Sequence, residues 1–163
     1  MFPPDIHDLA RKLVESCAAK KRTVATAESC TGGLIAGAIT QIPGASDIFE
    51  RGFVTYGDLA KTEMLGVPAR LIERCGAVGA EVAEAMAAGA LEKSRADIAV
   101  SATGIAGPGG GSGDKPVGLV FVGIASRTGA VFHERMQFRG ERDDIRLQSV
   151  KEALRLLLAA SDE

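Results

Sequence analysis

Histidine, cysteine and aromatic residues are scarce in this sequence, and the few cysteines limit the metal sites and disulfides that the protein can form. The 163 residues include two histidines, three cysteines, one tyrosine and no tryptophan. The cysteines at positions 17, 30 and 75 are odd in number and form no CxxC pair, which argues against a zinc site and against a disulfide framework. We therefore expect no metal site.

Long apolar runs and a strong net charge are also missing. No run is long enough to span a bilayer, and the start MFPPDIHDLARK lacks the apolar core of a signal peptide, so we expect a cytoplasmic protein without membrane contact. The net charge of -2 argues against nucleic-acid binding, which usually requires a strongly basic face. The length suits a single domain over residues 1–163 with a sizeable core.

The familiar nucleotide-binding motifs fail on spacing, although a glycine-rich segment is present. TGIAGPGGGSGDKPVG, residues 103–118, contains neither a P-loop nor a GxGxxG fingerprint, and a strand rather than a helix follows it. Glycines such as Gly104 and Gly107 can turn backbone N–H groups toward an anion and let the backbone approach a ligand closely. The segment is therefore a candidate binding loop, and a flexible surface loop is the alternative.

The hydrophobic pattern predicts alternating helices and strands. We expect helices over residues 5–20, 31–41, 58–65, 68–75, 80–94 and 141–160, and strands over 23–27, 51–56, 96–104, 116–126 and 130–138. The last two strands follow one another directly, as in a hairpin. This order predicts an α/β fold, a three-layer α/β/α sandwich with a mixed, mainly parallel sheet.

Ligands of such sheets bind at the carboxyl ends of the strands, and two polar residues are predicted there. Ser29 lies in AESCTGG, directly after the first strand, and Thr103 lies at the end of the third. A serine between a strand and a helix is commonly a helix cap, so a catalytic role requires an activating base.

The choice of base is limited. His7 and His133 fall away from the predicted strand ends, which argues against a Ser-His-Asp triad, and the GxSxG motif of α/β-hydrolases is absent. Lys61 and Tyr56 remain. Tyr56 is the last residue of the second predicted strand, whose end should neighbour that of the first, and Lys61 lies about one turn into the helix that follows. Burial can lower the pKa of a lysine enough for it to act as a base, and the alternative is a solvated surface lysine.

Several segments together resemble the CinA C-terminal domain family. They are TVATAESCTGGLIA, FERGFVTYGDLAK, GAVGAEVAEAMA, SATGIAGPGGGSGDKPVG and FRGERDDIRLQSVKEAL, and they cover nearly the whole chain in order. The stand-alone members of this family are nicotinamide-nucleotide amidohydrolases. One departure is visible, because Gly79-Ala80 stands where many relatives have Ser-Glu.

The resemblance implies that the chain hydrolyses nicotinamide mononucleotide to nicotinate mononucleotide and ammonia, without a metal or a cofactor. It implies that Ser29 is the nucleophile, Lys61 the base and Tyr56 a supporting hydroxyl. Thr103 would help to hold the site, and Arg142 would bind the phosphate.

This chemistry assigns roles to the residues around Ser29. Backbone N–H groups of the helix start would stabilise the oxyanion; they belong to Cys30, Thr31, Gly32 and Gly33. Glu28 suits the positively charged pyridinium ring, and a structural role suits it equally.

Other functions remain open from the sequence. They are a non-catalytic nucleotide-binding module, a cysteine amidase that uses Cys30, and an amidase for a different nucleotide. The resemblance and the apolar AMAAGA stretch favour a homo-oligomer, although this stretch also suits the core.

Overall fold

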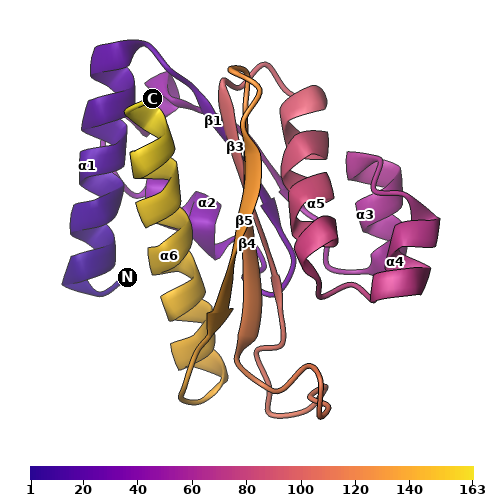
Figure 1. Cartoon of the computed structure of the whole chain (residues 1–163). Helices are drawn as coiled ribbons and strands as arrows, with labels where there is room; N and C mark the ends of the chain where they lie inside the picture. Colours follow the sequence, from indigo (N-terminus) through magenta and orange to yellow (C-terminus); the bar gives the residue numbers. More distant parts are fainter.

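Five strands form one mixed sheet in the computed structural model, which describes residues 1–163 (Figure 1). The strands are β1 (Val24–Glu28), β2 (Phe49–Val54), β3 (Ile98–Gly104), β4 (Leu119–Ser126) and β5 (Val131–Gln137), in the spatial order β2-β1-β3-β4-β5. β1 pairs in parallel with β2 and β3, whereas β4 is antiparallel to both of its neighbours. Only β4 therefore runs against the others, and the predicted mainly parallel sheet is confirmed.

Helices cover both faces of this sheet (Figure 1). One face is covered by α1 (Pro4–Lys20), α2 (Leu34–Thr40) and α6 (Arg142–Ser161); the other by α5 (Ala80–Glu92), with α3 (Asp58–Leu65) and α4 (Ala69–Cys75) outside it. A short 3-10 helix, Ala45–Asp47, precedes β2. None of the helices combines the length and apolarity needed to cross a membrane. The predicted three-layer α/β/α sandwich is confirmed.

The burial of each strand follows from its place in the sheet. Every residue of β1 and β4 is buried, because helices cover both faces of these central strands. The edge strand β5 alternates between exposed and half-buried residues, as a strand with one solvated face does. The larger apolar core lies between the sheet and the α1, α2 and α6 layer, and a smaller one lies under α5.

Three features of the structure differ from the predictions made from the sequence. The helix predicted from residue 31 begins at Leu34, because Gly32 and Gly33 have φ values of 58° and 102°, outside the helical region. β2 ends at Val54, so Tyr56 lies beyond the strand and not at its last residue. The AMAAGA stretch is largely buried within this chain, so it gives no support to a homo-oligomer.

Candidate active site

The carboxyl ends of β1, β2 and β3 meet at one edge of the sheet. The N–H of Ser29, directly after β1, donates to the Ala102 carbonyl of β3 at 2.9 Å, and the Thr55 N–H donates to the Glu28 carbonyl at 2.8 Å. A pocket of about 270 Å³ opens at this edge. Eight of the predicted residues line it: Ser29, Cys30, Tyr56, Lys61, Thr103, Gly104, Gly107 and Arg142. Four do not: Glu28, Thr31, Gly32 and Gly33.

Lys61 reaches Ser29 from the neighbouring helix α3. Its Nζ lies 3.1 Å from the Ser29 Oγ and donates to the carbonyls of Thr55, at 2.9 Å, and Tyr56, at 3.3 Å. The lysine is only 1% exposed and forms no ion pair. Burial lowers the pKa of Lys61, and the nearby Asp58 carboxylate opposes this shift only in part.

Close packing of α3 on α5 fixes the place of this lysine. A Cβ added to Gly89 in α5 would lie 2.0 Å from the Leu65 carbonyl oxygen at the end of α3. Glycine at position 89 therefore allows the two backbones to touch. This contact holds α3 against the body of the protein, so Lys61 projects toward Ser29 from a rigid element.

Glu28 lies beneath the site and not in the pocket. Its fully buried carboxylate accepts hydrogen bonds from the N–H groups of Gly33 and Ile35, both at 3.0 Å, and of Ala36, at 2.9 Å. These donors open α2, so the carboxylate satisfies the start of that helix. This arrangement favours the structural role for Glu28 over contact with a ligand.

We expect Glu28→Ala to lower the free energy of unfolding by about 3 kcal/mol or more, because it leaves three N–H groups without their charged acceptor. Urea denaturation measures this change. Glu73→Ala is the control, since Glu73 is exposed on α4 and makes no hydrogen bond or ion pair. Equal stability of the two variants would contradict the structural role.

Only two N–H groups between residues 29 and 36 have no partner inside the protein. Ser29 donates to β3, Gly32 to the Ser29 carbonyl and Leu34 to the Thr31 carbonyl, and Glu28 accepts from Gly33, Ile35 and Ala36. Those of Cys30 and Thr31 remain. Of the four donors predicted for an oxyanion, Gly32 and Gly33 are thus already engaged.

Arg142 is the first residue of α6 and lines the same pocket. It donates to the Gly107 carbonyl at 2.6 Å and to the Tyr56 hydroxyl at 3.0 Å. The phenol of Tyr56 thus faces Arg142, while its main-chain carbonyl faces Lys61. Thr103 donates to the Ala77 carbonyl at 2.7 Å, which ties the end of β3 to the segment before α5.

The alternative nucleophile and the histidines are poorly placed for catalysis. Cys30 is only 6% exposed, and burial raises the pKa of its thiol to about 11, so little thiolate forms near neutral pH. His7 is exposed on α1. The Nδ1 of His133 lies 2.7 Å from Glu84, and neither histidine lines the pocket.

Sequence reasoning missed part of the pocket lining. The additional residues are Ala77, Val78, Ile105, Ala106, Gly109 and Gly110. The glycine-rich segment was a usable signal for the last four, since it was already a candidate loop. Gly79 is the N-cap of α5 and does not line the pocket, so the departure at position 79 affects a helix end.

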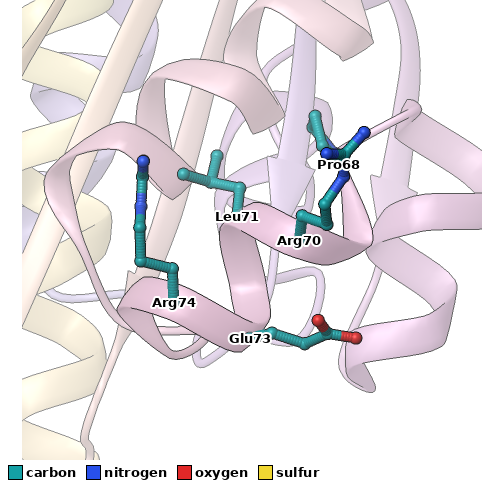
Figure 2. A pocket seen from close by; sticks show the side chains of 5 residues that line it. All are labelled: Pro68, Arg70, Leu71, Glu73 and Arg74. Carbon is teal, nitrogen blue, oxygen red and sulfur yellow. The ribbon is translucent and has the colours of Figure 1, made fainter.

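A larger concave surface lies elsewhere, along α4. It measures about 730 Å³, is open to solvent and is lined by Pro68, Arg70, Leu71, Glu73 and Arg74 (Figure 2). It contains no nucleophile and lies away from the strand ends, so size alone does not identify the active site. No group of three or more His, Cys, Asp or Glu side chains is placed to hold a metal ion.

The fold defines an α/β sandwich protein with a pocket at the carboxyl ends of its parallel strands, where ligands of such sheets bind. Residues 6–161 match the CinA C-terminal domain, and the chain belongs to this family.

This chain is similar both to proteins of about its own length and to longer proteins. Nicotinamide-nucleotide amidohydrolase PncC of Enterobacter agglomerans is 48% identical over 153 residues, which cover 94% of this chain and 93% of that protein. PncC of Escherichia coli K12 is 46% identical over 157 residues, which cover 96% of this chain and 95% of that protein. A CinA-like protein of Akkermansia muciniphila is 52% identical over 93% of this chain, which spans only 37% of that longer relative.

Solved structures share the whole fold. The competence/damage inducible protein CihA from Agrobacterium tumefaciens is 49% identical, with a TM-score of 0.97 over 100% of this chain and 99% of that one. A CinA superfamily protein from Escherichia coli is 34% identical, with a TM-score of 0.91 over 98% of this chain and 93% of that one.

Proposed function

We propose that the chain hydrolyses the carboxamide of nicotinamide mononucleotide, which yields nicotinate mononucleotide and ammonia. The observation that carries this proposal is the 3.1 Å separation between the Ser29 Oγ and the Nζ of the buried Lys61. The PncC relatives support the choice of substrate, because they match this chain over nearly their whole length.

The surroundings of Lys61 suit a neutral amine. A neutral lysine has two N–H donors and one lone pair, and the carbonyls of Thr55 and Tyr56 provide acceptors for two donors. The lone pair is then left for the hydroxyl of Ser29. In this state the Ser29 hydroxyl donates a hydrogen bond to the Lys61 Nζ. This makes Ser29 a stronger nucleophile than a hydroxyl without a neighbouring base.

The reaction then proceeds through an acyl-enzyme. The Ser29 Oγ attacks the carboxamide carbon as its proton moves to the Lys61 Nζ, and the free N–H of Cys30, which lines the pocket, stabilises the oxyanion. Lys61 returns the proton to the amide nitrogen, the C–N bond breaks and ammonia leaves. Water next attacks the ester carbon and gives a proton to Lys61, which passes it to the Ser29 Oγ as the nicotinate product is released.

The part of the pocket between Arg142 and the glycine-rich loop suits a phosphate. Arg142 provides a guanidinium beside the glycine-rich loop, and Gly107, Gly109 and Gly110 let the backbone approach a ligand closely. A volume of about 270 Å³ lies just below the usual range of roughly 300–1,000 Å³, which favours a mononucleotide over a dinucleotide. The buried Glu28 carboxylate is not available to the pyridinium ring.

Comparison of nicotinamide mononucleotide with its nucleoside tests this assignment. We expect Arg142→Ala to raise KM for the mononucleotide by roughly 10- to 100-fold, because a charge-assisted contact with phosphate is worth about 1.5–3 kcal/mol. The nucleoside lacks the phosphate, so it should be a poor substrate for the parent and lose little more in the variant. Ammonia release measures both.

Tyr56→Phe is the matched control, since it removes the partner hydroxyl of Arg142 and keeps the guanidinium. Its KM should change much less than that of Arg142→Ala. Equal losses for nucleotide and nucleoside in Arg142→Ala would make this arginine structural. A parent that binds the mononucleotide but releases no ammonia would instead favour a binding module.

A further inference from the structure

A second arginine of α6 contacts the turn that carries Ser29. The Nε of the half-buried Arg146 donates to the Cys30 carbonyl at 3.1 Å, and its Nη2 donates to the Thr31 carbonyl at 3.3 Å. These are its only hydrogen bonds, and it forms no ion pair with a carboxylate. Arg146 does not line the pocket, so it can act only through the turn.

Gly32 makes room for this contact. A Cβ added to Gly32 would lie 3.3 Å from the Nη2 of Arg146, closer than most real Cβ contacts. Its φ of 58° also belongs to the left-handed region, which glycine adopts at little cost. Glycine at position 32 is thus explained by the shape of the turn and the neighbouring guanidinium, without any contact to a ligand.

The contact with Arg146 sets the direction of a peptide N–H. In a trans peptide the carbonyl of one residue and the N–H of the next point in opposite directions. The Thr31 carbonyl points toward Arg146, so the N–H of the same peptide, on Gly32, points the other way and donates to the Ser29 carbonyl at 3.0 Å. Because the Ser29 carbonyl is held in this way, the direction of the Cys30 N–H in the preceding peptide is also fixed, and Cys30 lines the pocket.

We propose that Arg146 is a positioning residue that holds the Ser29–Gly32 turn so that the N–H of Cys30 can stabilise the oxyanion formed at Ser29. This inference rests on the proposed amidase function. The guanidinium donates to two successive carbonyls from a 20-residue helix. Without it, the turn can rotate, and the Cys30 N–H, a donor that must be oriented before the reaction, is lost.

Arg146→Met tests this role, because methionine keeps part of the bulk and removes the donors. We expect kcat to fall by roughly 100-fold, the usual effect of losing one oxyanion donor. KM for nicotinamide mononucleotide should change by less than about threefold, since Arg146 does not line the pocket. Arg146→Lys should lie between parent and Arg146→Met, because a lysine cannot reproduce the fork of donors.

Chemical rescue separates positioning from a general structural role. Millimolar guanidinium should restore part of kcat to Arg146→Ala and none to Ser29→Ala. Arg155→Met is the matched control, since Arg155 lies on the same helix and pairs only with the surface residues Glu134 and Glu152. Its kcat should equal that of the parent.

Labelling of Ser29 by a fluorophosphonate provides a readout that does not depend on the nucleotide. The rate should fall in Arg146→Met as kcat does. Near-parent kcat and labelling in Arg146→Met would overturn the inference, as would a loss that guanidinium does not rescue. A parent that is labelled but releases no ammonia from nicotinamide mononucleotide would contradict the proposed substrate, and the labelling rates would still decide the role of Arg146.

Discussion

Replacement of Ser29 by alanine is expected to reduce kcat for nicotinamide mononucleotide by roughly 10⁴-fold or more, because the proposed mechanism forms no acyl-enzyme without the Ser29 hydroxyl. The side chain is small and only half-buried, so the variant should unfold at the same urea concentration as the parent. Ammonia release measures turnover. Binding of the mononucleotide, measured by calorimetry, should persist.

Cys30→Ala is the control, since Cys30 is the neighbouring residue and also lines the pocket. It should retain most of the activity. The raised pKa and the burial of its thiol also predict slow alkylation of Cys30 at pH 7. An active Ser29→Ala together with an inactive Cys30→Ala would overturn the assignment in favour of a cysteine amidase.

Lys61→Arg is expected to be almost as inactive as Lys61→Ala, because a guanidinium stays protonated and cannot accept the Ser29 proton. Lys61→Met should also be inactive. It should remain folded, since it fills much of the same buried space without a charge. Substantial turnover by Lys61→Arg would reduce Lys61 to an electrostatic contact, and another group would have to take the proton.

The pH dependence of kcat/KM in the parent enzyme also tests Lys61 as the proposed base. Burial lowers the pKa of Lys61 from its ordinary value near 10.5. The proposed mechanism requires the neutral amine. The fraction of neutral amine grows as pH rises, so kcat/KM should rise with pH and level off above the pKa of the folded protein. The midpoint should lie below 10.5. A flat profile from pH 6 to pH 10 in a folded enzyme would contradict Lys61 as the base.

Much of this fold could be predicted from the residues alone. Helices with a clear apolar stripe and strands of continuous apolar residues produce periodic signals, so the element order and the three layers were predicted correctly. The helix over residues 58–65 was predicted with its observed bounds. Errors occurred where glycine interrupts a pattern, as at Gly32 and Gly33.

Strand ends were informative for the site as well. Parallel strands bring their carboxyl ends to one edge, so the neighbourhood of Ser29, Thr103 and Lys61 follows from the element order. The resemblance to the CinA C-terminal domain family added Arg142, which lies on the last helix and lines the same pocket.

Other features depend on which hydrogen-bonding groups the folded chain brings together, and periodicity carries no information about them. The place of Glu28 under α2 is decided by three N–H groups that point at its carboxylate. The contact of Arg146 with the Ser29 turn joins residues 115 and 116 positions apart. The order of helices and strands is enough to predict the layers and the strand edge at which the pocket opens. Which polar groups are free to react depends on the folded structure, because folding brings a hydrogen-bond partner to some groups and leaves others without one.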